Sequence, residues 1–334
     1  MGIPVIDVRS PAEYEHAHIP GAINIPLFNN VERANIGTLY KINGQREAIL
    51  TGLEIVGQKI RSIAEQGLKT AKDGKLLLHC WRGGMRSASM AWLFEKVGIQ
   101  SFVLIGGYKS YRSFIREYFS GKFKLCVLGG MTGSGKSEIL MELESSGYQV
   151  IHLEEIAHHK GSAFGSLGES PQKNNEQFEN DLFTSLFSLN ASETIWIEDE
   201  SRNIGRNIIP SEFFNTMSTS PLIVIEIEKE LRVKRLVEVY GKFSNEELSI
   251  CLNKLSRRLG GLNTNLAKLA LEEGKPERTA QIVLDYYDKT YKFGLNRRPK
   301  NKIYFCKSNT ANPKENAKLI ASKAIHNKLC LQAV

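Results

Sequence analysis

The chain has 334 residues, of which 42% are hydrophobic and 24% are charged, as in an ordinary globular protein. Its length exceeds the roughly 250–300 residues at which a single core stops growing, so we expect two domains. No apolar run approaches the roughly 20 residues of a membrane span, and no export signal opens the chain, so we expect no membrane association. Five cysteines at scattered positions favour a reducing cytoplasm over a disulfide scaffold.

The formal net charge of +8 is distributed unevenly. Residues 1–120 hold 15 Lys and Arg against 10 Asp and Glu, a net +5, whereas residues 121–228 hold 7 against 16, a net −9. Residues 229–302 hold 17 against 9, a net +8, and the remainder holds 5 against 1, a net +4. A basic segment of this kind is typical of a nucleic-acid-binding surface, but a set of solvated helix faces explains it equally well.

The first 120 residues alternate short apolar runs with apolar positions at helical spacing. The expected strands lie within 4–10, at the end of 18–26, at 75–79 and at 102–105, and the expected helices at 46–68, at 87–97 and from 108 onward. Strands that alternate with helices in this way predict an α/β domain with a parallel sheet. We assign this first domain to residues 1–120.

A second α/β domain is expected over residues 121–334, with the boundary near 118–123. Its predicted strands lie at 123–128, 149–153, 194–198, 222–227 and 302–306. Between the last two strands, a long helical stretch at about 229–293 holds most of the basic residues. The second domain therefore includes a helical, basic segment at about 229–302.

Cys80 lies between a predicted strand and a predicted helix and is followed by Gly83 and Gly84. Such a turn can point successive backbone N–H groups inward, and the helix N-terminus adds positive potential. Arg82 and Arg86 increase that potential. These effects should lower the pKa of the thiol and supply a thiolate nucleophile. A buried structural cysteine is the ordinary alternative, which the flanking arginines and glycines disfavour.

These motifs resemble the rhodanese family of sulfurtransferases. The runs D-V-R-S-P-A-E-Y and H-I-P-G-A-I-N-I-P come first, and C-W-R-G-G-M-R-S follows them. In that family the loop cysteine carries a persulfide sulfur. The resemblance implies that Cys80 is a chalcogen-carrying nucleophile, and that Arg82 and Arg86 hold an anionic donor or orient the loop.

Residues 125–137 read L-C-V-L-G-G-M-T-G-S-G-K-S and match the phosphate-binding pattern G-x-x-x-x-G-K-[ST] after a predicted strand. The glycines permit a tight backbone path whose N–H groups point at phosphate oxygens. Lys136 would reach a terminal phosphate, and the hydroxyl of Ser137 could ligate Mg²⁺. The predicted phosphate-binding residues are Gly130, Thr132, Gly133, Ser134, Gly135, Lys136 and Ser137.

A nucleoside triphosphatase also needs an acidic residue at the end of a second strand to hold the metal ion. The run I-W-I-E-D-E offers Glu198 and Asp199, and we predict Asp199 and Ser137 as the Mg²⁺ ligands. Arg202 follows closely and is predicted to clamp an anion. A nucleotide and a diphosphate without a nucleoside both fit this arrangement.

The order of motifs over the whole chain resembles the tRNA 2-selenouridine synthases. After the rhodanese-like part come G-G-M-T-G-S-G-K-S, L-E-E-I-A-H-H-K-G-S-A-F-G and E-D-E-S-R-N-I-G, and the likeness runs from about Pro4 to residue 300. That family replaces sulfur by selenium in the 2-thiouridine at the tRNA wobble position. It takes selenium from selenophosphate and passes through an S-geranylated uridine made from geranyl diphosphate.

The resemblance has consequences for both sites. It implies that the P-loop holds geranyl diphosphate, with Lys136 and Arg202 stabilising the departing pyrophosphate, and that Cys80 serves the selenium step. It also implies a substrate loop that contains His159, Lys160 and Ser162. The implied partners are the anticodon region of tRNA and an enzyme that supplies selenophosphate.

The basic helical segment supplies the predicted tRNA surface. Arg232 and Arg235 lie on one predicted helix, and Arg257 and Arg258 lie on the next. Such groups bind the phosphate backbone, and interleaved aromatic rings can stack on unpaired bases. Aromatic residues on helices more often pack in the core, so the role of the rings stays open.

Two other functions stay open beside the transferase. One is an ATP-using tRNA sulfurtransferase or kinase fusion, in which the P-loop activates a substrate by phosphoryl transfer. The other is a nucleotide-gated tRNA-binding protein, which the intact Cys80 and Lys136 disfavour. The sequence does not separate a prenyl diphosphate from ATP at the P-loop.

Overall fold

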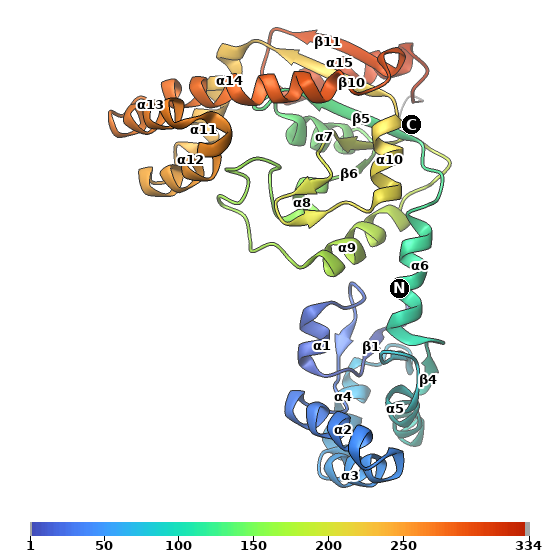
Figure 1. Ribbon diagram of the computed structural model, residues 1–334. Coiled ribbons are helices and arrows are strands. Elements are labelled where there is room, and N and C mark those ends of the chain that lie inside the picture. The colour runs from blue at the N-terminus through green and yellow to red at the C-terminus, as the bar shows by residue number, and fades with distance from the viewer. Residues whose placement is uncertain (1, 331–334) are drawn as a thin grey trace. The chain divides into compact units, whose positions relative to one another are not determined.

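The computed structural model describes residues 2–330, which form two compact units that divide between Tyr118 and Phe119. The short segment Glu179–Asp181 groups with the first unit. Each unit contains a parallel β-sheet accompanied by helices, so the predicted α/β fold class is confirmed (Figure 1).

The first unit contains a four-stranded parallel sheet with the order β2-β1-β3-β4. Its strands are β1 (Val5–Asp7), β2 (Ile23–Asn24), β3 (Lys75–His79) and β4 (Gln100–Val103). Its helices are α1 (Pro11–His16), α2 (Asn30–Ile42), α3 (Gln45–Gly57), α4 (Ile60–Thr70), α5 (Met85–Lys96) and α6 (Gly107–Tyr118). Asp7 pairs with His79 at the carboxyl ends of the two central strands, directly before Cys80. The sheet therefore positions the cysteine loop.

The segment predicted as one helix at 46–68 is two helices, α3 and α4. The helical pattern breaks after Gly57, where the Lys59 N–H donates to the carbonyl of Val56 in a tight turn. Helix α4 then packs closely on α5 through Gly67, because a Cβ atom at this position would lie 2.4 Å from the ring of Phe94.

The second unit contains a five-stranded parallel sheet with the order β11-β10-β5-β7-β6. Its strands are β5 (Leu125–Gly130), β6 (Gln149–Ile151), β7 (Ile195–Glu198), β10 (Leu222–Ile227) and β11 (Ile303–Ser308), and a separate hairpin joins β8 (Asn203–Ile204) to β9 (Asn207–Ile208). Its helices are α7 (Lys136–Ser145), α8 (Leu153–Ala157), α9 (Asn175–Phe187), α10 (Ser211–Thr219), α11 (Lys229–Tyr240), α12 (Asn245–Leu259), α13 (Gly261–Glu272), α14 (Pro276–Leu295) and α15 (Pro313–His326). The five predicted strands of this sheet are all present.

Strand β5 lies at the centre of the second sheet, and all six of its residues are buried. The chain leaves β5 toward β6 on one side and later crosses to β10 on the other. In open α/β sheets, ligands bind at the carboxyl ends of strands where the strand order reverses. The loop at 130–137 lies at that position.

The basic segment forms helices α11 to α14, which lie together beside the second sheet (Figure 1). Their shared core contains Leu252, Leu255 and Ala267, and both Tyr286 and Tyr287 pack against it. These two rings are therefore partly buried against the core of the helical segment. In the part of the chain that the structure describes, no helix is long and apolar enough to cross a membrane.

Candidate functional site

The Cys80 thiol is buried at the N-terminus of α5. The hydroxyl of Ser87 donates to its sulfur at 3.4 Å, and the side chain itself is only 4% exposed. Burial raises the pKa of the thiol, but hydrogen bonds from the Ser87 hydroxyl and from the backbone N–H groups of Ser87, Arg82 and Gly84 outweigh it. The net pKa of Cys80 is lowered, so the loop favours a thiolate, as the sequence predicted.

The loop holds this shape through direct backbone packing. Gly83 and Gly107 both have positive φ values, +64° and +59°. A Cβ atom at Gly107 would lie 2.4 Å from both the Cys80 carbonyl oxygen and the Gly83 nitrogen. One at Gly83 would lie 2.5 Å from the carbonyl oxygen of Leu104. Only glycine fits either position.

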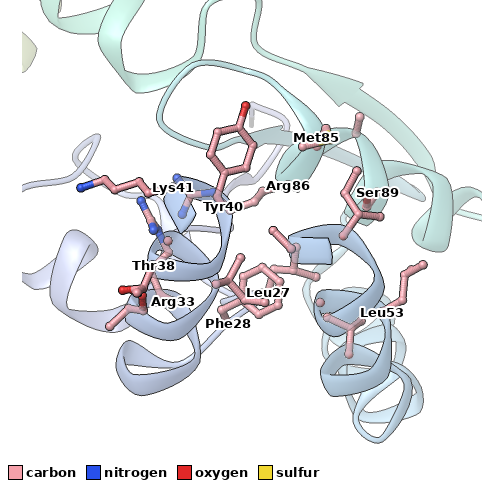
Figure 2. Close-up of a pocket in the computed structure, with 18 of the residues that line it drawn as sticks. Leu27, Phe28, Arg33, Thr38, Tyr40, Lys41, Leu53, Met85, Arg86 and Ser89 are labelled. Atoms are coloured by element: carbon pink, nitrogen blue, oxygen red, sulfur yellow. The ribbon is translucent and has the colours of Figure 1, made fainter. Parts of the chain in front are cut away.

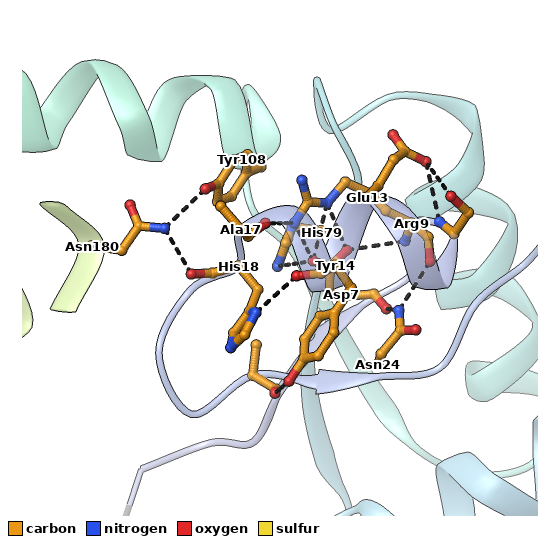
Figure 3. Close-up of polar contacts among 12 residues, drawn as sticks. Asp7, Arg9, Glu13, Tyr14, Ala17, His18, Asn24, His79, Tyr108 and Asn180 are labelled. Atoms are coloured by element: carbon orange, nitrogen blue, oxygen red, sulfur yellow. Dashed lines mark hydrogen bonds and ion pairs between the residues drawn. The ribbon is translucent and has the colours of Figure 1, made fainter. Parts of the chain in front are cut away.

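A buried ion pair between Asp7 and Arg9 is linked to the Cys80 loop through Tyr108 (Figure 3). The Nε of Arg9 lies 3.0 Å from both carboxylate oxygens of Asp7, and the Arg9 guanidinium also donates to the carbonyl of Ala17. Its carbon Cζ lies 4.0 Å from the ring centre of Tyr108, whose backbone N–H donates to the carbonyl of Cys80. The D-V-R run of the sequence thus fixes the peptide that carries the nucleophile.

The two loop arginines have different surroundings. Arg86 donates to the Glu13 carboxylate at 2.8 Å. Burial raises the pKa of Glu13, but the hydrogen bond and charge of Arg86, together with the Ser10 N–H and the Arg33 charge, outweigh it, so the net pKa of Glu13 is lowered. Arg82 is exposed. Arg86 therefore fits the predicted role of orienting the loop, whereas Arg82 keeps a guanidinium available for an anionic donor.

The P-loop has the backbone path that its sequence predicts. Gly133 and Gly135 have positive φ values, +83° and +74°, and helix α7 begins directly afterwards at Lys136. The Lys136 ammonium group lies 3.4 Å from the carbonyl of Gly130. A Cβ atom at Gly130 would lie 2.5 Å from the hydroxyl of Ser134, so the loop is closely folded on itself. The geometry suits a phosphate group held by successive N–H groups.

Arg232 and Arg235, predicted to bind tRNA, lie against the P-loop instead. Arg232 is 3% exposed, forms a bidentate ion pair with Asp288 at 2.8 Å and donates to the carbonyl of Thr132 at 3.1 Å. Arg235 pairs with Glu138 on α7, and its Cζ atom lies 3.2 Å from the point where Gly135 would carry a Cβ atom. These contacts count against a tRNA-binding role for Arg232, and charge spacing on α11 does not reveal which face packs inward.

Two glutamates face the same site: Glu154, which the sequence analysis did not assign, and Glu198, which it offered beside Asp199 as a candidate acidic residue. The Ser137 hydroxyl donates to Glu154 at 2.7 Å, and Glu154 lies on the short helix α8. Glu198 is fully buried at the end of β7 and accepts from the Leu153 N–H at 2.8 Å. Burial, reinforced by the Glu154 charge, raises the pKa of Glu198 to about 8, so this carboxyl is neutral near pH 7. The L-E-E run after β6 was the sequence feature that could have pointed to Glu154.

Asp199 and Arg202 do not take the positions that the sequence predicted. Arg298 donates to one oxygen of Asp199 at 2.5 Å, and the Tyr291 hydroxyl donates to the other at 3.2 Å. This carboxylate is thus engaged by two other side chains, which disfavours it as a metal ligand. Arg202 donates to the hydroxyl of Ser211, and within residues 2–330 no hydrogen bond joins it to the P-loop. In the same described range, no cluster of three His, Cys, Asp or Glu side chains could hold a metal ion.

The predicted substrate loop, which contains His159, Lys160 and Ser162, packs closely against Glu200, an acidic residue that follows β7. A Cβ atom at Gly161 would lie 2.4 Å from the Glu200 carboxylate. Lys160 pairs with Glu169 within the loop at 2.8 Å. Burial lowers the pKa of His159, which leaves its ring neutral near pH 7. Ser162 faces a cavity that also reaches the P-loop.

That cavity is narrow, with a volume of about 80 Å³, and its walls are almost wholly apolar. Thr132 of the P-loop lies at it, and α11 supplies Leu236 and Tyr240. The remaining lining residues are Phe164, Val237, Gly241, Leu248, Leu271, Pro276, Thr279, Ala280, Val283 and Tyr287. Burial also raises the pKa of Tyr240 to about 12, so its hydroxyl stays neutral. A hydrocarbon group bound here would lie next to the phosphate loop.

Arg257 and Arg258 are exposed at the C-terminus of α12. Neither forms an ion pair within residues 2–330. They are available to phosphates at the surface, so their role in tRNA binding stays a prediction.

The two sites define a rhodanese-like unit and a P-loop unit in one chain. Residues 2–114 match the family model described as rhodanese-like domain. Residues 123–318 match the family model described as tRNA 2-selenouridine synthase AAA domain. Both matches agree with the two kinds of loop seen in the structure.

Several curated relatives carry the name tRNA 2-selenouridine synthase. One from Pseudomonas savastanoi pv. phaseolicola is 34% identical over 330 residues, which cover 87% of this chain and 88% of the relative. One from Aeromonas salmonicida is 31% identical, with 90% of each chain covered. One from Nitrosomonas europaea is 37% identical, with 71% of this chain and 63% of the relative covered. The chain therefore belongs to the tRNA 2-selenouridine synthase family and is an enzyme, as its sequence predicted.

The thiolate geometry predicts how Cys80 reacts. Ser87→Ala removes the hydroxyl that donates to the sulfur, so the pKa of Cys80 should rise and its alkylation by iodoacetamide at pH 7 should slow several-fold. Ser89→Ala, an exposed change on the same helix, should leave the rate unchanged. Mass spectrometry locates the label. Burial raises the pKa of all four other cysteines, which should react far more slowly: Cys126, Cys251, Cys306 and Cys330. Equal rates in both variants would contradict this role for Ser87.

The buried carboxyl of Glu198 predicts a pH-dependent stability. Its pKa is about 8 in the folded state, whereas a solvated glutamate has a pKa of 4.5, so folding favours its protonated form. This contribution is complete below about pH 4.5 and is lost as the pH rises toward 8, at up to about 1.4 kcal/mol per pH unit. Glu198→Gln should therefore raise the urea midpoint relative to wild type increasingly from pH 5 to pH 8. The exposed control Glu238→Gln should show no such trend, and a constant difference for Glu198→Gln would contradict the assigned pKa.

Proposed function

We propose that this enzyme converts wobble 2-thiouridine in tRNA to 2-selenouridine in two steps, first S-geranylation from geranyl diphosphate and then selenation from selenophosphate. The observation that carries the first step is the apolar cavity beside Thr132. A prenyl diphosphate pairs an anionic head with a hydrocarbon chain, as the loop and this cavity do. The base of a nucleotide would place polar edges against apolar walls at a cost in free energy. This favours the prenyl donor over ATP.

In the first step, the sulfur on C2 of the nucleoside attacks the first carbon of the geranyl chain. The carbon–oxygen bond breaks, the nucleoside loses its N3 proton to solvent, and pyrophosphate leaves with the electron pair. Lys136 and the P-loop N–H groups would stabilise its growing charge. Arg235 lies beside Gly135 and adds a second cation, in the place first given to Arg202. The neutral state of Glu198 avoids a buried negative charge next to the diphosphate.

Mg²⁺ fits this site only in part. The Ser137 hydroxyl and the Glu154 carboxylate are oxygen ligands 2.7 Å apart, and Mg²⁺ commonly takes one or two protein oxygens plus phosphate oxygens and waters. These two residues would hold the ion, which when bound would neutralise charge on the diphosphate. The contacts of Asp199 with Arg298 and Tyr291 count against its predicted role as a ligand.

In the second step, selenium at the oxidation level of selenide attacks C2. The C2–Se bond forms, the C2–S bond breaks, and the geranyl thiolate leaves with the electron pair and takes up a proton. Hydrolysis of selenophosphate to selenide and phosphate supplies the selenium. Cys80 would serve this step as the chalcogen-handling thiolate, and Arg82 would bind the anionic donor. A cytoplasmic location and a selenophosphate-supplying partner enzyme complete the proposal.

Two variants should fail at different steps. Lys136→Ala should abolish geranylation and therefore net selenation, because lost charge at departing pyrophosphate typically costs several kcal/mol. Cys80→Ser should abolish selenation but leave geranylation of 2-thiouridine measurable. The test is mass analysis of tRNA nucleosides after incubation with geranyl diphosphate, with and without selenophosphate.

Supplying the intermediate directly separates the two steps. Pre-geranylated tRNA should restore selenation by Lys136→Ala but not by Cys80→Ser. Full selenation by Cys80→Ser would remove the thiol from the second step. Production of ADP and a phosphorylated nucleoside from ATP, without geranylation, would favour the kinase alternative instead.

The exposed arginines of α12 should contribute to tRNA affinity. Changing Arg257 and Arg258 together to alanine removes two possible phosphate contacts, so the slope of log affinity against log salt should fall by roughly one to two units. Geranyl diphosphate binding should stay unchanged. The matched control is Lys318→Ala on α15, which removes one exposed charge outside the basic segment. Affinity and slope at wild-type values in the double variant would place the tRNA surface elsewhere.

A further inference from the structure

A large cavity lies beside the Cys80 loop in the first unit. Its volume is about 860 Å³, within the range of about 300–1,000 Å³ that is typical of small-molecule sites. Residues of α2 and α3 form one side, and residues of the loop after Cys80 and of α5 form the other (Figure 2). Leu27 and Phe28 also line it. The site thus borders the segment that carries the nucleophile.

The side of the cavity that α3 forms is apolar and open to solvent. Ile49 and Leu53, four residues apart on α3, both line it and are 39% and 65% exposed. Leu50 is 53% exposed on the same helix but does not line the cavity. Apolar side chains gathered on one exposed face are typical of a binding site, since water solvates them poorly.

Cations surround this apolar surface. Arg33, Lys41, Arg82 and Arg86 all contribute to the lining. Arg33 and Arg86 share Glu13 as their partner, at 3.5 and 2.8 Å, whereas within residues 2–330 Lys41 and Arg82 form no ion pair. Apolar walls with nearby cations complement a ligand that joins a hydrocarbon chain to a phosphate backbone.

We propose that this cavity binds the prenyl chain of S-geranylated 2-thiouridine in tRNA, with the flanking cations meeting the adjacent phosphates. The inference rests on the proposed function, because the geranylation step makes this nucleoside. It adds a second prenyl-binding site, in the unit that carries Cys80, to the donor cavity beside Thr132.

Binding the chain here selects the intermediate and positions its leaving group. Met85 and Arg82 line the cavity just after Cys80, so a chain held there keeps the C2–S bond near the loop. When selenium bonds to C2 and this bond breaks, the geranyl thiol is still held by apolar walls. Unmodified 2-thiouridine has no prenyl chain and would therefore bind this cavity more weakly than the geranylated nucleoside.

The test compares two anticodon stem-loop RNAs, one with S-geranyl-2-thiouridine and one with S-methyl-2-thiouridine. The full-length wild type should bind the geranyl RNA at least roughly tenfold more tightly, because only that RNA buries a long chain. The double variant Ile49→Gln/Leu53→Gln should lose most of this preference. Leu50→Gln, an equal change on the same helix outside the cavity, should keep it. Because all three positions are exposed, the variants should remain folded, as circular dichroism will check.

Equal binding of the two RNAs by the wild type would overturn the proposal, and so would an unchanged preference in the double variant. Geranylation of 2-thiouridine RNA is measured in parallel and should survive in the double variant, since it uses the P-loop. If the wild type fails to geranylate yet keeps a cavity-dependent preference for geranyl RNA, the first step of the proposed function fails and the cavity assignment stands.

Discussion

The Cys80 loop depends on backbone that packs directly against backbone. Gly83 and Gly107 leave no room for a Cβ atom, and their positive φ values would strain other residues. The N–H groups that stabilise the thiolate are therefore held by a fixed turn rather than by mobile side chains. A larger residue at Gly107 would move the Cys80 carbonyl and the whole N–H array together, so the electrostatics of the site cannot be separated from the fold.

The P-loop is supported differently, by charged side chains from α11. Arg232 joins the Thr132 carbonyl to Asp288 of α14, so the helical segment braces the loop. Removing Asp288 would leave a buried guanidinium with an unpaired charge, which is costly. The basic segment thus serves the phosphate site with its inward face and leaves Arg257 and Arg258 exposed on α12.

The sequence predicted what depends on local pattern. Apolar runs predicted the strands of both sheets, and the two glycine-containing motifs predicted the loops that carry Cys80 and Lys136. It could not predict contacts between distant segments, because spacing within one helix does not show which face packs inward. The ion pairs of Arg235 with Glu138 and of Asp199 with Arg298 were not predictable for this reason, since the partners lie far apart in the sequence. Glu198 was noted only as an acid, since its raised pKa comes from burial.

Both proposed steps place an anion beside a hydrocarbon chain, and this shared chemistry explains why each unit has an apolar cavity next to an N–H-lined loop. The donor cavity needs to hold a chain only until its bond to oxygen breaks, and it is narrow, at about 80 Å³. The cavity near Cys80 must admit a chain attached to a nucleoside in RNA, and it is far larger, at about 860 Å³, and bordered by four cations. Alkylation makes the sulfur a good leaving group in the proposed selenation step. Of the two cavities, the one of about 860 Å³ lies beside the thiolate loop. In the proposed mechanism, the chain is therefore both the chemical activation of the sulfur and the feature by which the enzyme would distinguish intermediate from substrate.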